Sequence, residues 1–226
     1  MPNMNKISHF LVISIIILGM SQSQSFSTPG AFSITRLHYA GGGDWYSDPS
    51  SLPNLLEYIS IHTDIIVNPI EQRAQIGDDI FFQSHYIYIT GHGNIFFTDA
   101  DAQTLREHLL NGAFLHADDN YGMDKSFRRE IKKVFPDKDW VELPPTHEIF
   151  NIYYKFPNGL PKVHEHDGKR PQALGLFEGD KLIVLYTYEC DLGDGWEDPN
   201  AHNDPPEIRD EALKMGTNIV LYALSQ

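Results

Sequence analysis

The sequence predicts an α/β domain built on a mainly parallel sheet. Short apolar segments of strand length alternate with amphipathic helical segments along most of the 226 residues, a pattern typical of a sheet covered by helices on both faces. Glycine-rich and polar residues follow several of the strands, where the chain has to turn. A late pair of strands separated by Gly179 and Asp180 predicts an antiparallel hairpin.

The first half of the chain predicts three strands and two helices. In chain order, the expected elements are a strand over residues 32–39, a helix from Ser51 to Ile59, strands over residues 64–68 and 86–90, and a helix from Thr98 or Asp99 to Leu110. Ser51 and Thr98 are residue types that cap helices. Leucines follow each of them, at positions 52, 55 and 56 in the first helix and at positions 105, 109 and 110 in the second. Gly112 is placed to end the second helix.

The second half predicts a further strand, two helices and the hairpin. In chain order, the expected elements are a strand over residues 113–117, a helix containing residues 127–135, a less regular segment over residues 141–170, hairpin strands over residues 174–177 and 182–188, and a final helix after Pro205 and Pro206. Phe127, Ile131 and Val134 share one face of the first of these helices, and its basic opposite face is expected to be solvated. The whole pattern predicts a flavodoxin-like, doubly wound sheet with the antiparallel hairpin at one edge.

The N-terminus has the layout of a secretory signal. Lys6 precedes an apolar run over residues 10–20, and small residues follow where a signal peptidase cleaves. The run is too short to span a bilayer comfortably, although an uncleaved anchor is the alternative. We expect a signal peptide over residues 1–23, a flexible lead-in over 24–31 and a single domain over 32–226, exported to the periplasm or the extracellular space.

Charge and cysteine content exclude several classes of function. The formal net charge is −14, and cleavage of a signal peptide whose only charged residue is Lys6 leaves −15. Such a surface repels nucleic acid and anionic lipid, whereas it suits a neutral or cationic ligand or a metal ion. Cys190 is the only cysteine, which excludes an internal disulfide and a thiolate zinc cluster. The glycine run at residues 41–43 lacks the spacing of a dinucleotide-binding loop and fits a tight turn.

The candidate ligand-binding residues follow the predicted strands. In open α/β sheets, ligands bind beyond the carboxyl ends of the strands, and four separate segments bring polar and aromatic residues there. The expected ligand-binding residues are Asp44, Trp45, Tyr46, His92, Asn94, Asn120, Tyr121, Glu189, Asp191, Asp194 and Trp196. Aromatic rings of this set can stack on sugars or cations, or they can simply cover the end of the sheet.

Carboxylates and histidines supply candidates for catalysis and metal binding. Asp118 and Asp119 repel each other unless a cation or hydrogen-bond donors compensate, and His92 lies exposed between two glycines, so these three are the catalytic candidates. One of the two aspartates is expected to cap the next turn. The candidate ligands of a divalent zinc, manganese or calcium ion are His92, His116, Asp118, His164 and His166. A His-x-His pair in a Pro- and Gly-rich loop is also common on plain protein surfaces.

Five motifs carry a resemblance to a known family. They occupy residues 41–46, 90–93, 114–122, 165–168 and 191–196. With them, residues 32–224 resemble the bacterial family catalogued as domain of unknown function 4159, which is more distantly similar to the class I glutamine amidotransferase-like fold. That resemblance implies a flavodoxin-like sheet and a Cys nucleophile on the turn after a central strand. Because this chain has Asp118 and Asp119 there, it departs from the pattern and is not expected to hydrolyse glutamine.

Two functions follow from these residues. The first is a binding module whose acidic, aromatic crevice holds a small molecule, a glycan or a partner protein. The second is a metal-dependent hydrolase, in which His92, His116, Asp118 and Asp119 supply the ligands and a base for bound water. The second requires at least three of these side chains to converge on one point. The sequence favours the binding module, because it contains no complete catalytic set.

Overall fold

The computed structural model of the protein describes residues 30–164, 166 and 168–226. The expected signal peptide lies outside the described residues, as does the expected lead-in up to residue 29. Within the described part of the chain, no helix is both long and apolar enough to cross a bilayer.

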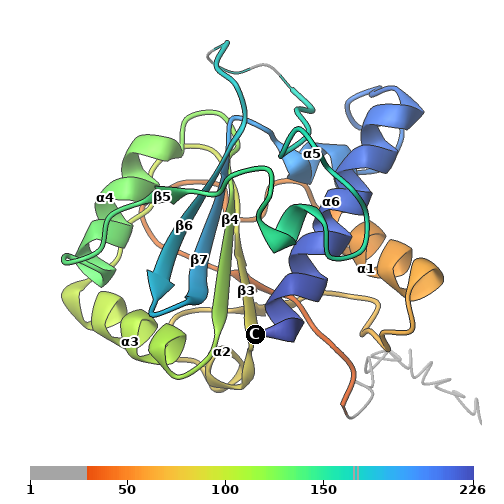
Figure 1. The fold of residues 1–226 in the computed structure, drawn as a ribbon. Helices are drawn as coiled ribbons and strands as arrows, with labels where there is room; N and C mark the ends of the chain where they lie inside the picture. The colour runs from red at the N-terminus through yellow and green to blue at the C-terminus, as the bar shows by residue number, and fades with distance from the viewer. Residues whose placement is uncertain (1–29, 165, 167) are drawn as a thin grey trace, which may run out of the picture.

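The described residues form a seven-stranded α/β sheet in the order β2-β1-β3-β4-β7-β6-β5. Figure 1 labels β3, β4, β7 and β6 of this sheet and the helices around it. The strands are β1 (Thr35–Leu37), β2 (Gln72–Ala74), β3 (Tyr86–Ile89), β4 (Phe114–Asp118), β5 (Val141–Glu142), β6 (Gln172–Glu178) and β7 (Lys181–Tyr188). All pairs from β2 to β7 are parallel, and β7, β6 and β5 pair antiparallel at one edge. The parallel part follows the flavodoxin-like strand order, which confirms the predicted doubly wound class. The antiparallel pairing of β6 with β7 confirms the predicted hairpin.

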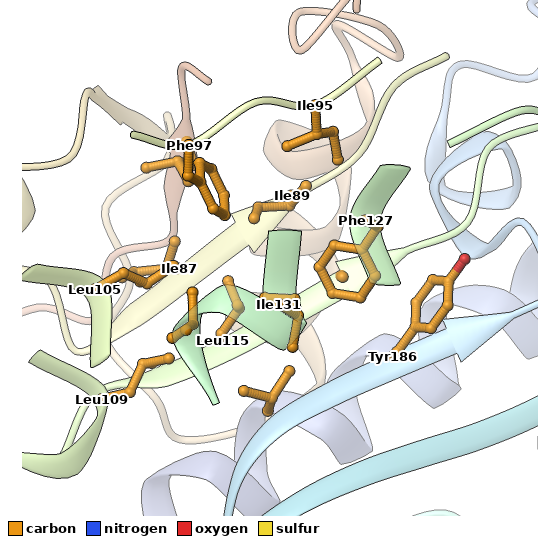
Figure 2. Close-up of a cluster of buried hydrophobic side chains, with 14 of the residues drawn as sticks. Ile87, Ile89, Ile95, Phe97, Leu105, Leu109, Leu115, Phe127, Ile131 and Tyr186 are labelled. Atoms are coloured by element: carbon orange, nitrogen blue, oxygen red, sulfur yellow. The ribbon is translucent and has the colours of Figure 1, made fainter. Parts of the chain in front are cut away.

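Helices cover both faces of the sheet. One face carries α1 (Ser51–His62), η1 (Glu148–Phe150), α5 (Leu192–Trp196) and α6 (Pro206–Ser225), and the other carries α2 (Asp79–Gln83), α3 (Asp99–Leu110) and α4 (Asp124–Val134). Successive side chains of β3 point to opposite faces of the sheet. Tyr86 and Tyr88 pack against the helices of the first face, and Ile87 and Ile89 pack against those of the second. Figure 2 shows Ile87 and Ile89 in the second layer, among side chains of α3 and α4.

Local sequence explains the better-predicted helices. The Thr98 side chain accepts from the backbone N–H of Asp101, whose carboxylate accepts in return from the backbone of Thr98, so a capping box starts α3. In α4, Phe127 and Ile131 are buried on the face that contacts the sheet. The same helix carries Glu130, a buried carboxylate that accepts from the backbone N–H of Phe97 at 2.9 Å.

The first part of the sheet differs from the prediction in two places. Residues 64–68 are not a strand, although Val67 forms an isolated bridge with Phe32. The segment continues into Pro69, which has no N–H to donate to a ladder. Regular pairing resumes only at Gln72–Ala74, which is the true edge strand β2. The expected strand over residues 32–39 is likewise reduced to Thr35–Leu37.

Candidate functional site

The loops after the parallel strands are hydrogen-bonded to one another at the carboxyl edge of the sheet. Asp48, in the loop after β1, accepts from Asn120 Nδ2 at 2.9 Å and from Thr90 Oγ1 at 3.4 Å. Asp119, after β4, accepts from the backbone N–H of Glu189, after β7, at 3.1 Å. These contacts join the ends of β1, β3, β4 and β7 into one polar edge. Asn120 is therefore a buried link between loops.

The glycine run positions the loop after β1 against the loop after β3. The backbone N–H of Gly43 donates to the Asn94 carbonyl at 3.0 Å. Gly41 has φ +115°, and a Cβ there would lie 2.6 Å from the same carbonyl oxygen. These glycines therefore permit close backbone packing, as expected of a turn. The contact brings His92 Nδ1 to 3.0 Å from Asp44 Oδ2 in a largely exposed pair at the rim.

His116 lies in the core rather than at the edge. Its Nδ1 is 3.0 Å from Tyr86 Oη and its Nε2 is 3.0 Å from Thr187 Oγ1, so both ring nitrogens have partners inside the protein. Burial lowers the pKa of His116 to about 3. Because β4 alternates, His116 and Asp118 face the same layer, toward α5.

Asp118 is hydrogen-bonded to the backbone at the start of α5. Its Oδ2 accepts from the backbone N–H of Gly193 at 2.6 Å, and its Oδ1 accepts from Thr187 Oγ1 at 2.5 Å. Burial, reinforced by the nearby charge of Asp191, raises the pKa of Asp118 to about 8. Among the described residues, the set of His92, His116, Asp118 and Asp119 does not converge as a metal site, so the geometry required of the predicted hydrolase is not met.

The four aromatic candidates differ in how far they are exposed. Trp196 is fully buried, and its Nε1 donates to the Ala212 carbonyl at 2.8 Å, so its predicted role in ligand binding is wrong. The α5 helix turns this ring toward α6, where Gly216 leaves room for it. Trp45 is half-buried and stacks on the His38 ring at 4.2 Å. Tyr46 and Tyr121 are each 61% exposed, and each makes an edge-to-face contact with one neighbouring ring.

The segment around His164 and His166 lies over the carboxyl edge. His166 Nε2 is 2.9 Å from Asp191 Oδ2, and His164 Nδ1 is 3.5 Å from the same oxygen. Asp191 itself has φ +56°, a left-handed conformation that turns the chain from β7 into α5. The two histidines of the His-x-His pair thus contact a residue predicted for the site, although they lie far from it in sequence.

A histidine–carboxylate cluster forms where this segment meets α5 and the loop after it. The cluster consists of His164, Asp194, Glu197, His202 and Asp204. His164 Nδ1 and His202 Nδ1 lie 2.8 and 3.4 Å from the same oxygen, Asp194 Oδ2. His164 Nε2 is 2.8 Å from Asp204, and His202 Nε2 is 2.9 Å from Glu197. One ligand atom each from His164, Asp194 and His202 falls within 4.8 Å of the other two, a spacing that can hold a metal ion.

Sequence reasoning missed two members of this cluster, His202 and Asp204. They stand in an irregular loop between α5 and α6 with no spacing that marks a site. The only available signal is that the loop continues directly from the acidic 191–197 segment.

A small cavity of about 220 Å³ opens beside the cluster, between the turn after β4 and the end of β7. It is lined by Asp119, Tyr121, Gly122, Asp124, Lys125, His166, Tyr188 and Glu189, and we call it the Asp119 pocket. Asp119 Oδ1 and His166 Nδ1 are buried, and neither has a hydrogen-bond partner among the described residues. Burial raises the pKa of Asp119 to about 6, although the hydrogen bond from the Glu189 backbone opposes the shift.

Cys190 does not have the properties of a nucleophile. It is fully buried, with Sγ 3.3 Å from the Thr187 carbonyl. Burial raises the pKa of its thiol well above the usual value, so the reactive thiolate is disfavoured.

Comparison with known sequences identifies the family of the chain. Residues 33–224 match the family model described as "Domain of unknown function (DUF4159)", and the chain belongs to that family. No curated protein sequence matches the chain.

Proposed function

We propose that this member of the DUF4159 family binds a small hydroxylated ligand, such as the end of a glycan, in the Asp119 pocket. The observation that carries the proposal is the pair of buried polar atoms in that pocket, Asp119 Oδ1 and His166 Nδ1, which lack partners in the described part of the chain. Buried polar atoms are nearly always hydrogen-bonded, and leaving one unsatisfied costs about 1–3 kcal/mol. A ligand hydroxyl would satisfy both atoms once the side chains that cover them move aside, because both atoms are buried in the ligand-free structure.

The chemistry of a hydroxyl fits these two atoms. Asp119 Oδ2 is already engaged by the Glu189 backbone, which leaves Oδ1 as an acceptor for a ligand O–H. The hydrogen bond from His166 Nε2 to Asp191 fixes the imidazole, whose Nδ1 is 4.0 Å from Asp119 Oδ2. A hydroxyl group is both donor and acceptor, so it can bond to the carboxylate and the imidazole at once.

The size and the walls of the pocket favour one sugar-sized group. A cavity of about 220 Å³ is smaller than the roughly 300–1,000 Å³ typical of drug-sized ligands. The exposed ring of Tyr121 lies 5.8 Å from the His166 ring and can stack on the apolar face of a sugar. Asp119 and Asp124 line the pocket, which disfavours a phosphorylated or carboxylated ligand.

One observation favours an enzymatic alternative at the same pocket. The pKa of Asp119, raised to about 6 by burial, is close to the range that suits a general base at neutral pH. Asp119 could then activate water toward a glycoside or ester held by His166 and Tyr121. We also propose, from the resemblance of the motifs, that the fold is related to the amidotransferases with carboxylates in place of the nucleophile, and that the chain acts outside the cytoplasm.

A glycan array tests this function directly. The full mature chain is applied beside two variants, Asp119→Asn and the matched control Asp180→Asn at the exposed hairpin turn. Asparagine at position 119 can still accept from the Glu189 backbone but presents an amide in place of a charged acceptor. Loss of a hydrogen bond to a charged group, worth about 1.5–3 kcal/mol, predicts roughly 10- to 100-fold weaker binding by Asp119→Asn.

Two outcomes would overturn the proposal. One is the absence of saccharide or polyol binding by the wild-type chain. The other is equal binding by Asp119→Asn and the wild type. Any hit is then tested for turnover, which separates a binding module from the hydrolytic alternative.

A further inference from the structure

We infer that the histidine–carboxylate cluster is a divalent metal site with His164, Asp194 and His202 as ligands. The inference goes beyond the proposed function, since it concerns different side chains and requires no saccharide. It rests on four features of the cluster: the convergence of its atoms, the outer partners of its histidines, an unpaired buried oxygen and its balance of charge.

The three ligand atoms converge as they would around an ion. The Nδ1 atoms of His164 and His202 lie 2.8 and 3.4 Å from Asp194 Oδ2. Ligands at 2.0–2.1 Å around a tetrahedral ion are separated by roughly 3.3 Å. The contact of His202 already has that spacing, and the contact of His164 needs to open by about half an ångström. Side-chain rotation alone can accommodate such a change.

The outer partners of both histidines are those of metal ligands. His164 Nε2 is 2.8 Å from Asp204 Oδ1, and His202 Nε2 is 2.9 Å from Glu197 Oε2. Histidines that bind metals almost always donate their second ring N–H to a carboxylate, carbonyl or water, and this fixes the tautomer and orients the ring. Here both histidines have a carboxylate behind them while their Nδ1 atoms face the same oxygen. In an incidental surface ion pair, there is no reason for two histidines to share one carboxylate oxygen and each have a second carboxylate on the other ring nitrogen.

A buried oxygen without a partner supplies independent support. Asp204 Oδ2 has no hydrogen-bond partner within the described residues, and the Asp204 side chain is only 9% exposed. A second oxygen, Asp191 Oδ1, is also buried and has no hydrogen-bond partner within the described residues. Both carboxylates contact His164. A cation beside His164 would reduce the electrostatic cost of burying these oxygens.

A cation would also improve the balance of charge in the cluster. The cluster contains the carboxylates of Asp194, Glu197 and Asp204, whereas its two imidazoles can supply at most two positive charges. Burying an excess of carboxylates is costly unless a cation compensates. A divalent ion would offset two of the three negative charges while the imidazoles stay in the neutral form that binds metals.

The donor set selects the class of metal. Two imidazole nitrogens with one carboxylate oxygen suit zinc and related transition metals, whereas calcium and magnesium prefer all-oxygen sites. Three protein ligands leave a fourth position of a tetrahedral ion for water or another group, as in catalytic rather than structural zinc sites. The site would therefore hold Zn²⁺ with one exchangeable position.

Calorimetric titration with ZnCl₂ tests the inference on the full mature chain without affinity-tag histidines. We expect one Zn²⁺ to bind per chain, with the affinity lowered about 10- to 100-fold by Glu197→Gln, which removes an outer partner. His202→Ala removes a ligand and should lower it further. Because His202 is exposed, this variant is expected to fold. His85→Ala is the matched control, since His85 is an exposed histidine outside the cluster and outside every candidate site.

Substitution with Co²⁺ gives a second readout through its visible absorption. Tetrahedral binding predicts intense bands in the wild-type chain that His202→Ala loses and His85→Ala keeps. The inference is overturned if the folded wild type binds no stoichiometric Zn²⁺, or if both His202→Ala and His164→Ala bind it as tightly as the wild type. Because the metal alone is the probe, either result is independent of whether the Asp119 pocket binds a saccharide.

Discussion

His166 and Asp191 are joined by a hydrogen bond of 2.9 Å between Nε2 and Oδ2, and this bond links the Asp119 pocket to the histidine–carboxylate cluster. Asp191 Oδ2 also lies 3.5 Å from His164 Nδ1. The carboxylate therefore orients one histidine of the pocket and contacts one histidine of the cluster. Asp191 belongs to neither proposed site, but it contacts one histidine of each.

Asp191→Asn tests this link. Asparagine tolerates the left-handed backbone at this position, where φ is +56°, so the fold should be retained. We expect weaker binding at both sites, about tenfold for Zn²⁺, because the variant removes the charge that holds both rings. Calorimetry with Zn²⁺, and separately with a saccharide in the presence of chelator, measures the two effects. A variant that binds both ligands normally would show that the two sites are not linked through Asp191.

Acid should destabilise the protein through His116. Burial lowers the pKa of His116 to about 3, whereas the unfolded chain binds a proton at about 6.5. Between these two pH values the unfolded state binds more protons than the folded state. The contribution of His116 to the free energy of unfolding is therefore fully present above pH 6.5 and is lost as the pH falls toward 3. This one group predicts a slope of about 1.4 kcal/mol per pH unit inside the window.

Urea unfolding at a series of pH values measures that slope for the wild type and for His116→Gln. Glutamine can keep hydrogen bonds to Tyr86 and Thr187 but does not titrate, so the variant should lose less stability between pH 6 and pH 4. Parallel pH profiles for the two proteins would contradict this account of His116.

Glu130 is expected to stabilise the packing of α4. Its carboxylate is buried and accepts from the Phe97 backbone at 2.9 Å and from Lys133 Nζ at 2.7 Å. Glu130→Gln should lower the free energy of unfolding by about 1–3 kcal/mol, because it removes a charged acceptor from donors that it satisfies. Glu107→Gln, on an exposed face of α3, is the control and should cost less than about 0.5 kcal/mol. Equal losses in the two variants would contradict the role of Glu130.

The glycine run gives a test with a control inside the same turn. Gly41 and Gly42 both have positive φ, but only at Gly41 would a Cβ meet other atoms, 2.6 Å from the Asn94 carbonyl oxygen. Gly42→Ala should cost about 1 kcal/mol for backbone strain alone, and Gly41→Ala should cost clearly more. Thermal unfolding of the two variants measures the difference. Equal melting temperatures would mean that the two loops do not pack as closely as described.

The sequence predicted the elements whose local pattern and tertiary role agree. Strand β3 and most of β7 are runs of apolar and aromatic residues, and α3 and α4 carry a capping motif or an amphipathic stripe. The short α5 could not be predicted, because two glycines interrupt it. Those glycines are required by packing, since a Cβ at Gly195 would lie 2.5 Å from Ala212. Strand β2 was missed because it is short, polar and at an edge.

The sequence indicated where the site lies in the fold better than it indicated which side chains belong to the site. The structure brings His164 and His166 to Asp191, although nothing in the sequence places that segment over the edge of the sheet. His116 and Trp196 both lie close in sequence to the polar ends of strands, yet both side chains are buried. Strand alternation directs His116 inward, and the turn of α5 does the same for Trp196. Proximity in sequence to a strand end therefore does not tell which side chains reach solvent.

Protein-observed NMR with the tightest-binding saccharide tests the central claim most directly. Backbone amide shifts should concentrate at Tyr121, Gly122, Lys125 and Tyr188, which line the Asp119 pocket. They should be absent from the spectrum of Asp119→Asn at the same saccharide concentration. Shifts centred instead on residues 154–161 and Lys214, which line a larger cavity of about 430 Å³, would contradict the assignment of ligand binding to the carboxyl edge of the sheet.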